Sequence, residues 1–266
     1  MSPLTTNTII FITGAFLSHH VWDEWILWFK DRGYNCIAPA WPYKDDSAEK
    51  LRQRRPNDNE LAGIRLHQLL DHYTTIIEKE PQKPIVIGHS LGGLVVQALV
   101  NKNAVAAGVA IHSIPPKDSL SFDWPSLTLV LKSLTLPGSS KQTYLIGMKE
   151  WNKSVANGMS ADEQRDSYEK YAVPASRHVF SDFFTKAAKI DFKKQHPPLL
   201  FISGTEDKII PFAANYSNYL KYDRYHSVTG HKKFVNRNHL VLVMEVWEEE
   251  AGYIADWLDV VSPSPF

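Results

Sequence analysis

The first part of the chain alternates apolar runs with segments of helical periodicity. A β-branched and aromatic run at residues 8–12 ends in a Thr-Gly pair, which predicts a strand followed by a turn. Residues 18–32 have apolar positions at helical spacing and predict a helix, and residues 34–38 predict the next strand. A strand, a helix and a strand in this order predict a parallel pair with a right-handed crossover.

Residues 42–60 are polar and charged, and they predict a surface loop. The alternation then resumes with a helix at residues 61–77 and a strand at 85–87. A buried helix at 94–100 and a further strand at 104–111 follow. It stops again between residues 114 and 192, where prolines interrupt the chain and three helices are predicted at 149–156, 161–171 and 177–189. We expect this segment to be an inserted helical cap.

After the cap the pattern predicts two more strands, at residues 199–203 and 222–228. It also predicts two more helices, at residues 211–220 and 245–258. Six strands that alternate with helices predict an α/β fold, with a mainly parallel six-stranded sheet and helices on both faces. We therefore expect residues 1–113 and 193–266 to form the α/β core, and residues 114–192 to form the cap. Ligands of such sheets bind beyond the carboxyl ends of the strands.

Charge and composition narrow the classes of function. The 266 residues include 29 basic and 29 acidic side chains, so no nucleic-acid partner is expected. A signal peptide and an apolar run of membrane-spanning length are both missing from the pattern, so we expect no membrane span. Cys36 is the single cysteine, which excludes an intrachain disulfide and favours a cytoplasmic protein with a buried structural thiol.

The strongest chemical signal is the sequence GHSLG at residues 88–92, between an apolar strand and an apolar helix. It fits the G-x-S-x-G nucleophile elbow, in which a sharp turn exposes the serine hydroxyl above the sheet. Ser90 is therefore the predicted nucleophile. The amide of Leu91, at the start of the following helix, would face a developing oxyanion. The alternative is a glycine-rich turn whose serine only caps a helix.

A serine nucleophile needs a general base, and the base needs an acid that orients it. With this elbow the chain order is serine, acid, histidine. Glu206 and Asp207 follow a buried strand directly and compete for the role of the acid, with Asp118 a more distant choice. Among the histidines that follow, His239 lies in a loop before the closing helix and fits the base best.

Three other histidines are weaker candidates for the base. His231 lies just past the predicted last strand, and His226 lies inside it. His89 is part of the elbow itself and is expected to pack or to line the pocket. The second oxyanion amide should come from the loop after the first strand, where Ala15 or Phe16 would supply it.

Taken in order, these motifs resemble those of the α/β-hydrolase superfamily over essentially the whole chain. Gly204-x-x-Asp207 resembles its acid loop, which favours Asp207 over Glu206, and Asn238-His239 resembles its base loop. One departure is Thr13-Gly14 where members often carry His-Gly, and another is the missing acid between Pro39 and Pro42. The resemblance implies a six-stranded sheet, a helical cap and no cofactor; no metal is expected.

We therefore expect a serine hydrolase that cleaves a carboxylic ester or a related small acyl substrate through an acyl-enzyme. Relatives that act as dehalogenases or epoxide hydrolases use an aspartate at the position of Ser90, which disfavours those reactions. Perhydrolases and hydroxynitrile lyases retain the serine and stay open, as does a non-catalytic small-molecule receptor with this fold. Apolar cap residues, Tyr144 and Trp151 among them, would either form an apolar pocket or pack inside the cap.

Overall fold

The computed structural model describes residues 6–119, 142–223 and 225–261. Within these residues six strands form one sheet in the order β2-β1-β3-β4-β5-β6, and every neighbouring pair is parallel. The predicted fold class is therefore confirmed. The strands are β1 (Thr8–Ile12), β2 (Asn35–Ile37), β3 (Ile85–His89), β4 (Ala107–Ile111), β5 (Leu199–Gly204) and β6 (Thr229–Phe234).

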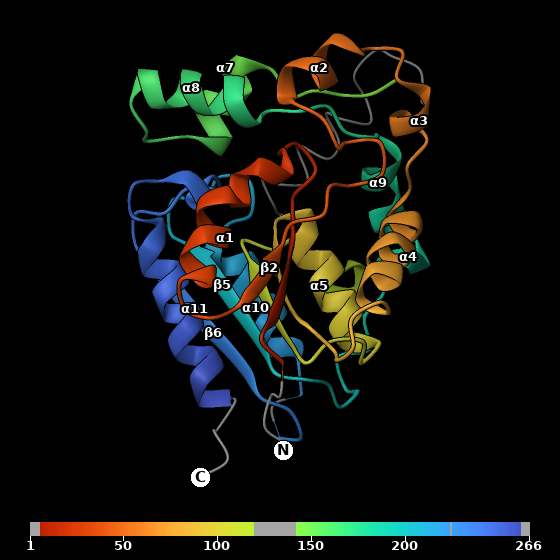
Figure 1. The fold of residues 1–266 in the computed structure, drawn as a ribbon, viewed down its shortest axis with the longest axis vertical. Coiled ribbons are helices and arrows are strands. Elements are labelled where there is room, and N and C mark those ends of the chain that lie inside the picture. Colours follow the sequence, from red (N-terminus) through yellow and green to blue (C-terminus); the bar gives the residue numbers. More distant parts are fainter. Residues whose placement is uncertain (1–5, 120–141, 224, 262–266) are drawn as a thin grey trace.

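The central strands are apolar on both sides because helices cover both faces of the sheet. Every residue of β3, β4 and β5 is buried. Figure 1 shows α1 and α11 together on one face and α4 and α5 on the other. The larger helices of the core are α1 (Asp23–Lys30), α4 (Leu66–Ile77), α5 (Leu91–Asn101), α10 (Phe212–Lys221) and α11 (Trp247–Val261).

The segment after β2 differs from the predicted loop. It contains two short helices, α2 (Ala48–Gln53) and α3 (Asn59–Ala62), whose N-caps are Ser47 and Asp58. The prediction was wrong because these helices are mostly polar and each buries only two side chains, Ala48 and Leu51 in α2 and Leu61 and Ala62 in α3. Leu51 and Ala48 form a small apolar cluster with Val173, so this segment packs against residues that are far away in the sequence.

Residues 142–192 are helical, although in shorter pieces than predicted. One predicted helix matches α8 (Ala161–Tyr171), whereas residues 177–189 form three short turns instead of one helix. The pieces are α7 (Met148–Glu150), the π-helical turn η3 (Trp151–Val155), α9 (His178–Ser181), η4 (Asp182–Phe184) and η5 (Lys186–Ala188). Residues 120–141 of the expected cap lie outside the described residues.

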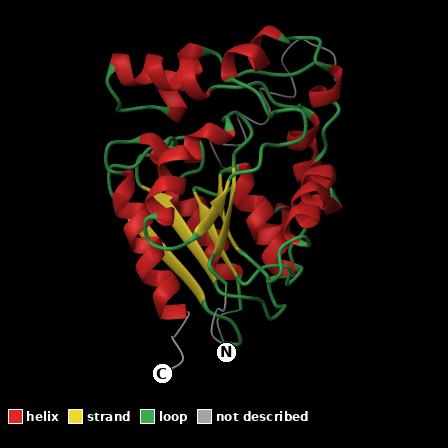
Figure 2. Ribbon diagram, viewed as in Figure 1, coloured by secondary structure: helices red, strands yellow, loops and turns green. Residues whose placement is uncertain are grey.

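Together with α2, helices α7 and α8 form a layer above the carboxyl ends of the strands (Figures 1 and 2). Arg52 of α2 joins the two parts of this layer, because its guanidinium donates to the carbonyl oxygens of Tyr168, Glu169 and Ala172. Trp151 is fully buried and donates to Ser167 Oγ, so it packs inside this layer.

The last strand lies later in the chain than predicted. Residues 222–228 alternate in polarity, yet β6 begins at Thr229. Its sequence, TGHKKF, is poor in the β-branched residues that mark strands, because an edge strand is only partly buried. His231 consequently lies inside β6, and His226 lies outside it, where its Nδ1 contacts Asp223 at 2.7 Å. Among the described residues, no helix is both long enough and apolar enough to cross a bilayer.

Candidate active site

Ser90 lies at a sharp turn between β3 and α5. Its backbone has φ 56° and ψ −116°, in the left-handed half of the map that non-glycine residues rarely occupy. The turn is possible because strand and helix approach very closely: a Cβ on Gly88 would lie 2.3 Å from the Gly92 carbonyl oxygen, and one on Gly92 would lie 2.2 Å from that of Ile12. The local sequence therefore produces the geometry of a nucleophile elbow.

His239 reaches Ser90 from the loop between β6 and α11. Its Nε2 lies 3.1 Å from Ser90 Oγ, which is hydrogen-bonding distance. Its Nδ1 lies 2.8 Å from Asp207 Oδ2, and both side chains are buried. The structure thus brings the three predicted side chains Ser90, His239 and Asp207 into one continuous chain of hydrogen bonds.

The other candidate acids lie elsewhere. Glu206 is exposed, and its carboxylate accepts from Thr205 Oγ1 at 3.3 Å. Asp118 is exposed in the turn η2 (Lys117–Ser119), and its carbonyl accepts from Lys221. Asp207 differs because it turns inward directly after β5.

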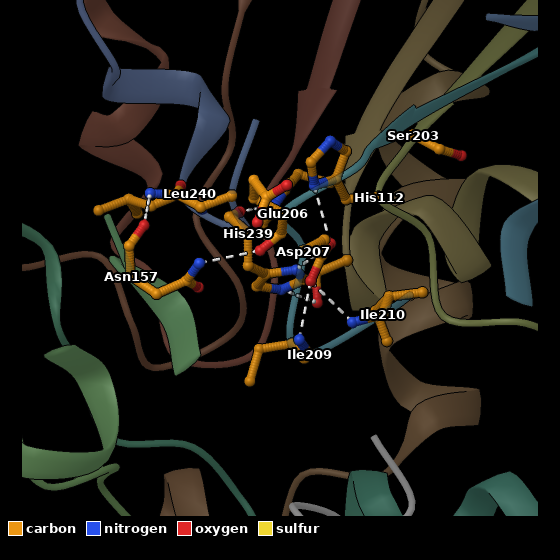
Figure 3. Close-up of polar contacts among 12 residues, drawn as sticks. His112, Asn157, Ser203, Glu206, Asp207, Ile209, Ile210, His239 and Leu240 are labelled. Atoms are coloured by element: carbon orange, nitrogen blue, oxygen red, sulfur yellow. Dashed lines mark hydrogen bonds and ion pairs between the residues drawn. The ribbon is translucent and has the colours of Figure 1, made fainter. Parts of the chain in front are cut away.

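Asp207 is held by donors on both of its oxygens. Oδ1 accepts the amide N–H groups of Ile209 and Ile210, each at 2.8 Å, and Oδ2 faces His239 (Figure 3). Burial alone would raise the pKa of Asp207. The charge of His239 and the hydrogen bonds around the carboxylate outweigh that effect and hold the pKa below its ordinary value. Asp207 therefore stays ionised and can stabilise a protonated His239.

His112 is a neighbour of Asp207 that the sequence reasoning missed. It directly follows β4, and its Nδ1 lies 2.8 Å from Asp207 Oδ2, the same oxygen that faces His239 (Figure 3). The ring is fully buried, and neither of its nitrogens makes a well-directed hydrogen bond within the described residues. The available signal was its position: the ends of β4 and β5 are adjacent in the sheet, so side chains that follow them meet.

The remaining candidate histidines have structural contacts. His89 Nε2 lies 2.7 Å from the carbonyl oxygen of His239 and so fixes the backbone of that residue. Burial and the neighbouring rings of His239 and His112 hold the pKa of His89 well below its ordinary value. On β6, His231 Nε2 lies 3.1 Å from Ser203 Oγ, and burial lowers its pKa to about 4. Neither His89 nor His231 contacts Ser90 Oγ.

Nitrogen atoms of His89, His112 and His239 lie within 4.8 Å of one another, which is a grouping that could hold a metal ion. However, both nitrogens of His239 already face Asp207 and Ser90. A bound metal would have to break one of these contacts, so the donor set suits proton transfer better than metal binding. The Cys36 thiol is not a competing nucleophile, because burial raises its pKa to about 12.

The loop after β1 passes close to Ser90. A Cβ on Gly14 would lie 3.0 Å from Ser90 Cβ, so the glycine permits this approach. The hydroxyl of Thr13, the residue that replaces the usual histidine, accepts from Trp22 Nε1 at 3.2 Å. Ala15 and Phe16 follow in this loop, and neither amide N–H has an acceptor within the described parts of the chain. Leu91 begins α5, where the first amides have no intrahelical partner.

Residues of the segment 142–192 contact the loops that carry these side chains. The Leu240 amide donates to the Val155 carbonyl at 3.1 Å. Asn157 Nδ2 donates to the Glu206 carbonyl at 2.9 Å, and Val173 N donates to the Phe16 carbonyl at 3.0 Å. Phe16 also stacks on Phe180, with ring centroids 5.2 Å apart. The segment 142–192 thus touches the acid, base and Ala15–Phe16 loops.

Comparison with protein families gives the class. Residues 9–251 match the model of the Alpha/beta hydrolase family, so the chain belongs to that family. No match was found among curated proteins.

Solved structures with the same fold cover nearly the whole chain. A monoacylglycerol lipase from Paleococcus ferrophilus is 18% identical, with a TM-score of 0.66 over 96% of this chain and 95% of the lipase. A pyrethroid hydrolase from Sphingobium faniae is 17% identical, with a TM-score of 0.61 over 98% of this chain and 100% of the other. Tomato methylketone synthase I, complexed with 2-tridecanone, is 14% identical, with a TM-score of 0.67 over 97% and 100% of the two chains.

Proposed function

We propose that the protein is a serine hydrolase that cleaves a carboxylic ester or a related small acyl substrate through an acyl-enzyme. The observation that supports this most directly is the unbroken contact from Asp207 through His239 to Ser90, with the serine at a strained turn. Membership of the family is compatible with it. The similar structures include a lipase and a hydrolase but also a methylketone synthase, so the fold alone does not choose the reaction.

In the proposed reaction Ser90 Oγ attacks the carbonyl carbon of the ester while His239 Nε2 takes its proton. The π electrons of the carbonyl move to its oxygen, and the amides of Leu91 and of Ala15 or Phe16 bind that oxyanion. Asp207 stabilises the imidazolium that forms. His239 then protonates the departing alcohol, which leaves an acyl-Ser90 ester.

Deacylation repeats these steps with water as the nucleophile. His239 takes a proton from the water as it attacks the acyl carbon, and the collapse of the second tetrahedral intermediate returns a proton to Ser90 Oγ. The products are a carboxylic acid and the free enzyme. No further reactant is needed.

We further propose that residues 114–192 form the cap that selects the substrate, since its described part contacts the acid, base and Ala15–Phe16 loops. The stacked rings of Phe16 and Phe180, with Tyr144 5.6 Å from Phe16, favour an apolar acyl or alcohol group. The buried free thiol of Cys36 is in keeping with the cytoplasm as its location.

The test is turnover of p-nitrophenyl esters of increasing acyl length by the purified protein and by Ser90→Ala. We expect the native protein to release p-nitrophenol, with the rate of Ser90→Ala lower by a factor on the order of 10⁴ or more. A parallel assay with a cyanohydrin as the substrate tests for lyase activity. Another, with hydrogen peroxide as the acyl acceptor, tests for perhydrolase activity. A folded protein that binds small apolar ligands and turns over none of these substrates would instead be a non-catalytic receptor.

A further inference from the structure

Lys44 is buried beneath the loop that follows β1. Only 3% of its surface is exposed, and its Nζ donates to the carbonyl oxygens of Ala15 at 2.8 Å and Leu17 at 3.3 Å. The ring of Trp41 lies 4.4 Å from the same nitrogen. Across residues 6–119, 142–223 and 225–261, Nζ forms no ion pair with a carboxylate, so two carbonyl dipoles and an aromatic face are its partners.

A buried ammonium without a counter-ion is costly, because the charge loses its hydration. Consistent with this, burial lowers the pKa of Lys44 to about 7. A leucine or methionine would fill a similar volume without that cost. A functional role of the ammonium at the carbonyls that it contacts would explain why the protein has a lysine at this position.

The contacts fix one side of the loop. Trp41 Nε1 donates to the Thr13 carbonyl at 3.0 Å, and Lys44 holds those of Ala15 and Leu17. Every second carbonyl from Thr13 to Leu17 is therefore bound by the segment after β2.

The cap holds the other side of the same loop. Val173 N donates to the Phe16 carbonyl at 3.0 Å, and Ser18 N donates to the Tyr171 carbonyl at 2.8 Å. Residues 13–18 are thus clamped between two structures, and the amides of Ala15 and Phe16 are left without an acceptor in the described residues. In a trans peptide the N–H and C=O groups point in opposite directions, so holding the Ala15 carbonyl turns the Phe16 N–H away from Lys44.

We propose that Lys44 is a positioning residue for the oxyanion-binding loop: by holding the carbonyls of Ala15 and Leu17, it keeps the loop amides preorganised beside Ser90. This inference rests on the proposed hydrolase function. The ammonium also polarises the Ala15–Phe16 peptide, which strengthens its N–H as a donor. Preorganised donors act mainly on the transition state, so the effect should fall on kcat rather than on KM.

The test compares Lys44→Met with Lys50→Met. Lys50 is the matched control, because it lies nearby on α2, is exposed and forms its ion pair with Asp46, at 3.3 Å. We expect Lys44→Met to lower kcat for a p-nitrophenyl ester by roughly ten- to a hundredfold, since a single oxyanion donor contributes at most about a thousandfold. KM should change less than about threefold, and Lys50→Met should match the native protein.

A trifluoromethyl ketone provides a second measurement. Addition of Ser90 Oγ to its carbonyl, with the proton passing to His239, gives a hemiketal oxyanion that needs the same amides. Its inhibition constant should rise in Lys44→Met by about the factor lost from kcat. A folded Lys44→Met with native kcat and a native inhibition constant overturns the proposal, as does an equal loss in Lys50→Met.

Hydrogen–deuterium exchange separates this inference from the proposed function. In Lys44→Met the amides of residues 13–18 should exchange faster than in the native protein, whether or not any ester is turned over. If the native protein has no esterase activity, the function fails while this exchange result still decides the role of Lys44. If Lys44→Met does not fold, Lys44→Gln keeps an uncharged N–H donor group and should still lower kcat relative to the native protein; native kcat in that variant contradicts the proposal.

Discussion

The end of β4 and the loop after β6 each place a histidine on the same oxygen of Asp207, and the two histidines differ in what lies beyond. Both Nδ1 atoms are 2.8 Å from Oδ2. His239 Nε2 continues to Ser90 Oγ at 3.1 Å, whereas His112 Nε2 is buried and unpartnered within the described residues. Contact with the acid therefore does not by itself identify the base; a continuous path from the acid to the nucleophile does.

The backbone at the two sites explains the difference. His112 has φ 46°, and its ring packs tightly against Gly204: a Cβ on that glycine would lie 2.8 Å from His112 Cε1. The ring is therefore fixed inside the core. His239 lies on a loop over the sheet and retains 6% exposure, close to Ser90 at 8%. We interpret His112 as a positioning residue for Asp207, and His239 as the proposed base.

The largest expected effect comes from His239→Ala. It removes the group that takes the proton from Ser90, so kcat should fall by a factor on the order of 10⁴ or more, as when a triad member is lost. Ester turnover by the folded variant measures this. Activity within tenfold of the native protein would mean that another group, His112 included, acts as the base.

A smaller effect is expected from His112→Phe, which keeps a ring but removes the nitrogen beside Asp207. The amides of Ile209 and Ile210 still hold the carboxylate, so kcat should fall by roughly tenfold, about the value of one contact to a charged group. The variant His112→Gln restores a donor and should recover part of the loss. If His112→Phe costs as much as His239→Ala, the distinction between the two histidines is wrong.

The smallest effect on activity is expected from His231→Gln, on β6. Its side chain contacts Ser203 and not Ser90, so kcat should stay within about twofold. The same substitution should, however, change how the free energy of unfolding depends on pH. Because burial lowers the pKa of His231 to about 4, the unfolded chain binds a proton between pH 6.5 and 4 that the folded chain does not.

The native protein should therefore lose stability as the pH falls through that window, and His231→Gln should lose less. Urea unfolding at pH 7 and at pH 4.5 measures the difference between the two proteins. An identical pH dependence in both would show that His231 does not contribute to acid sensitivity. A large loss of turnover in His231→Gln would move the proposed base from the loop to the strand.

The elbow could be predicted from the sequence because its chemistry is local. Gly88 and Gly92 are spaced by the turn itself, and the flanking apolar runs define the strand and the helix. The positions of Asp207 and His239 followed from their places after β5 and before α11. Their contacts with each other and with Ser90 depend on the fold and became visible only in the structure.

Lys44 and His112 were missed for one physical reason: their burial comes from contacts with distant residues. Lys44 lies in a charged stretch that predicts a solvated loop, yet its ammonium reaches the carbonyls of Ala15 and Leu17. His112 meets Asp207 only because β4 and β5 are neighbours in the sheet. Edge strand β6 was missed for a different reason, because it is only partly buried and lacks the apolar alternation of a more buried strand.

The central claim is that Ser90 is an activated nucleophile. Its most direct test is labelling of the folded protein with a fluorophosphonate, followed by intact-mass measurement and peptide mapping. In that reaction Ser90 Oγ displaces fluoride from phosphorus and the proton passes to His239. We predict one adduct, on Ser90, that is absent in Ser90→Ala and strongly slowed in His239→Ala; an unlabelled native protein, or an adduct on another residue, would contradict the account.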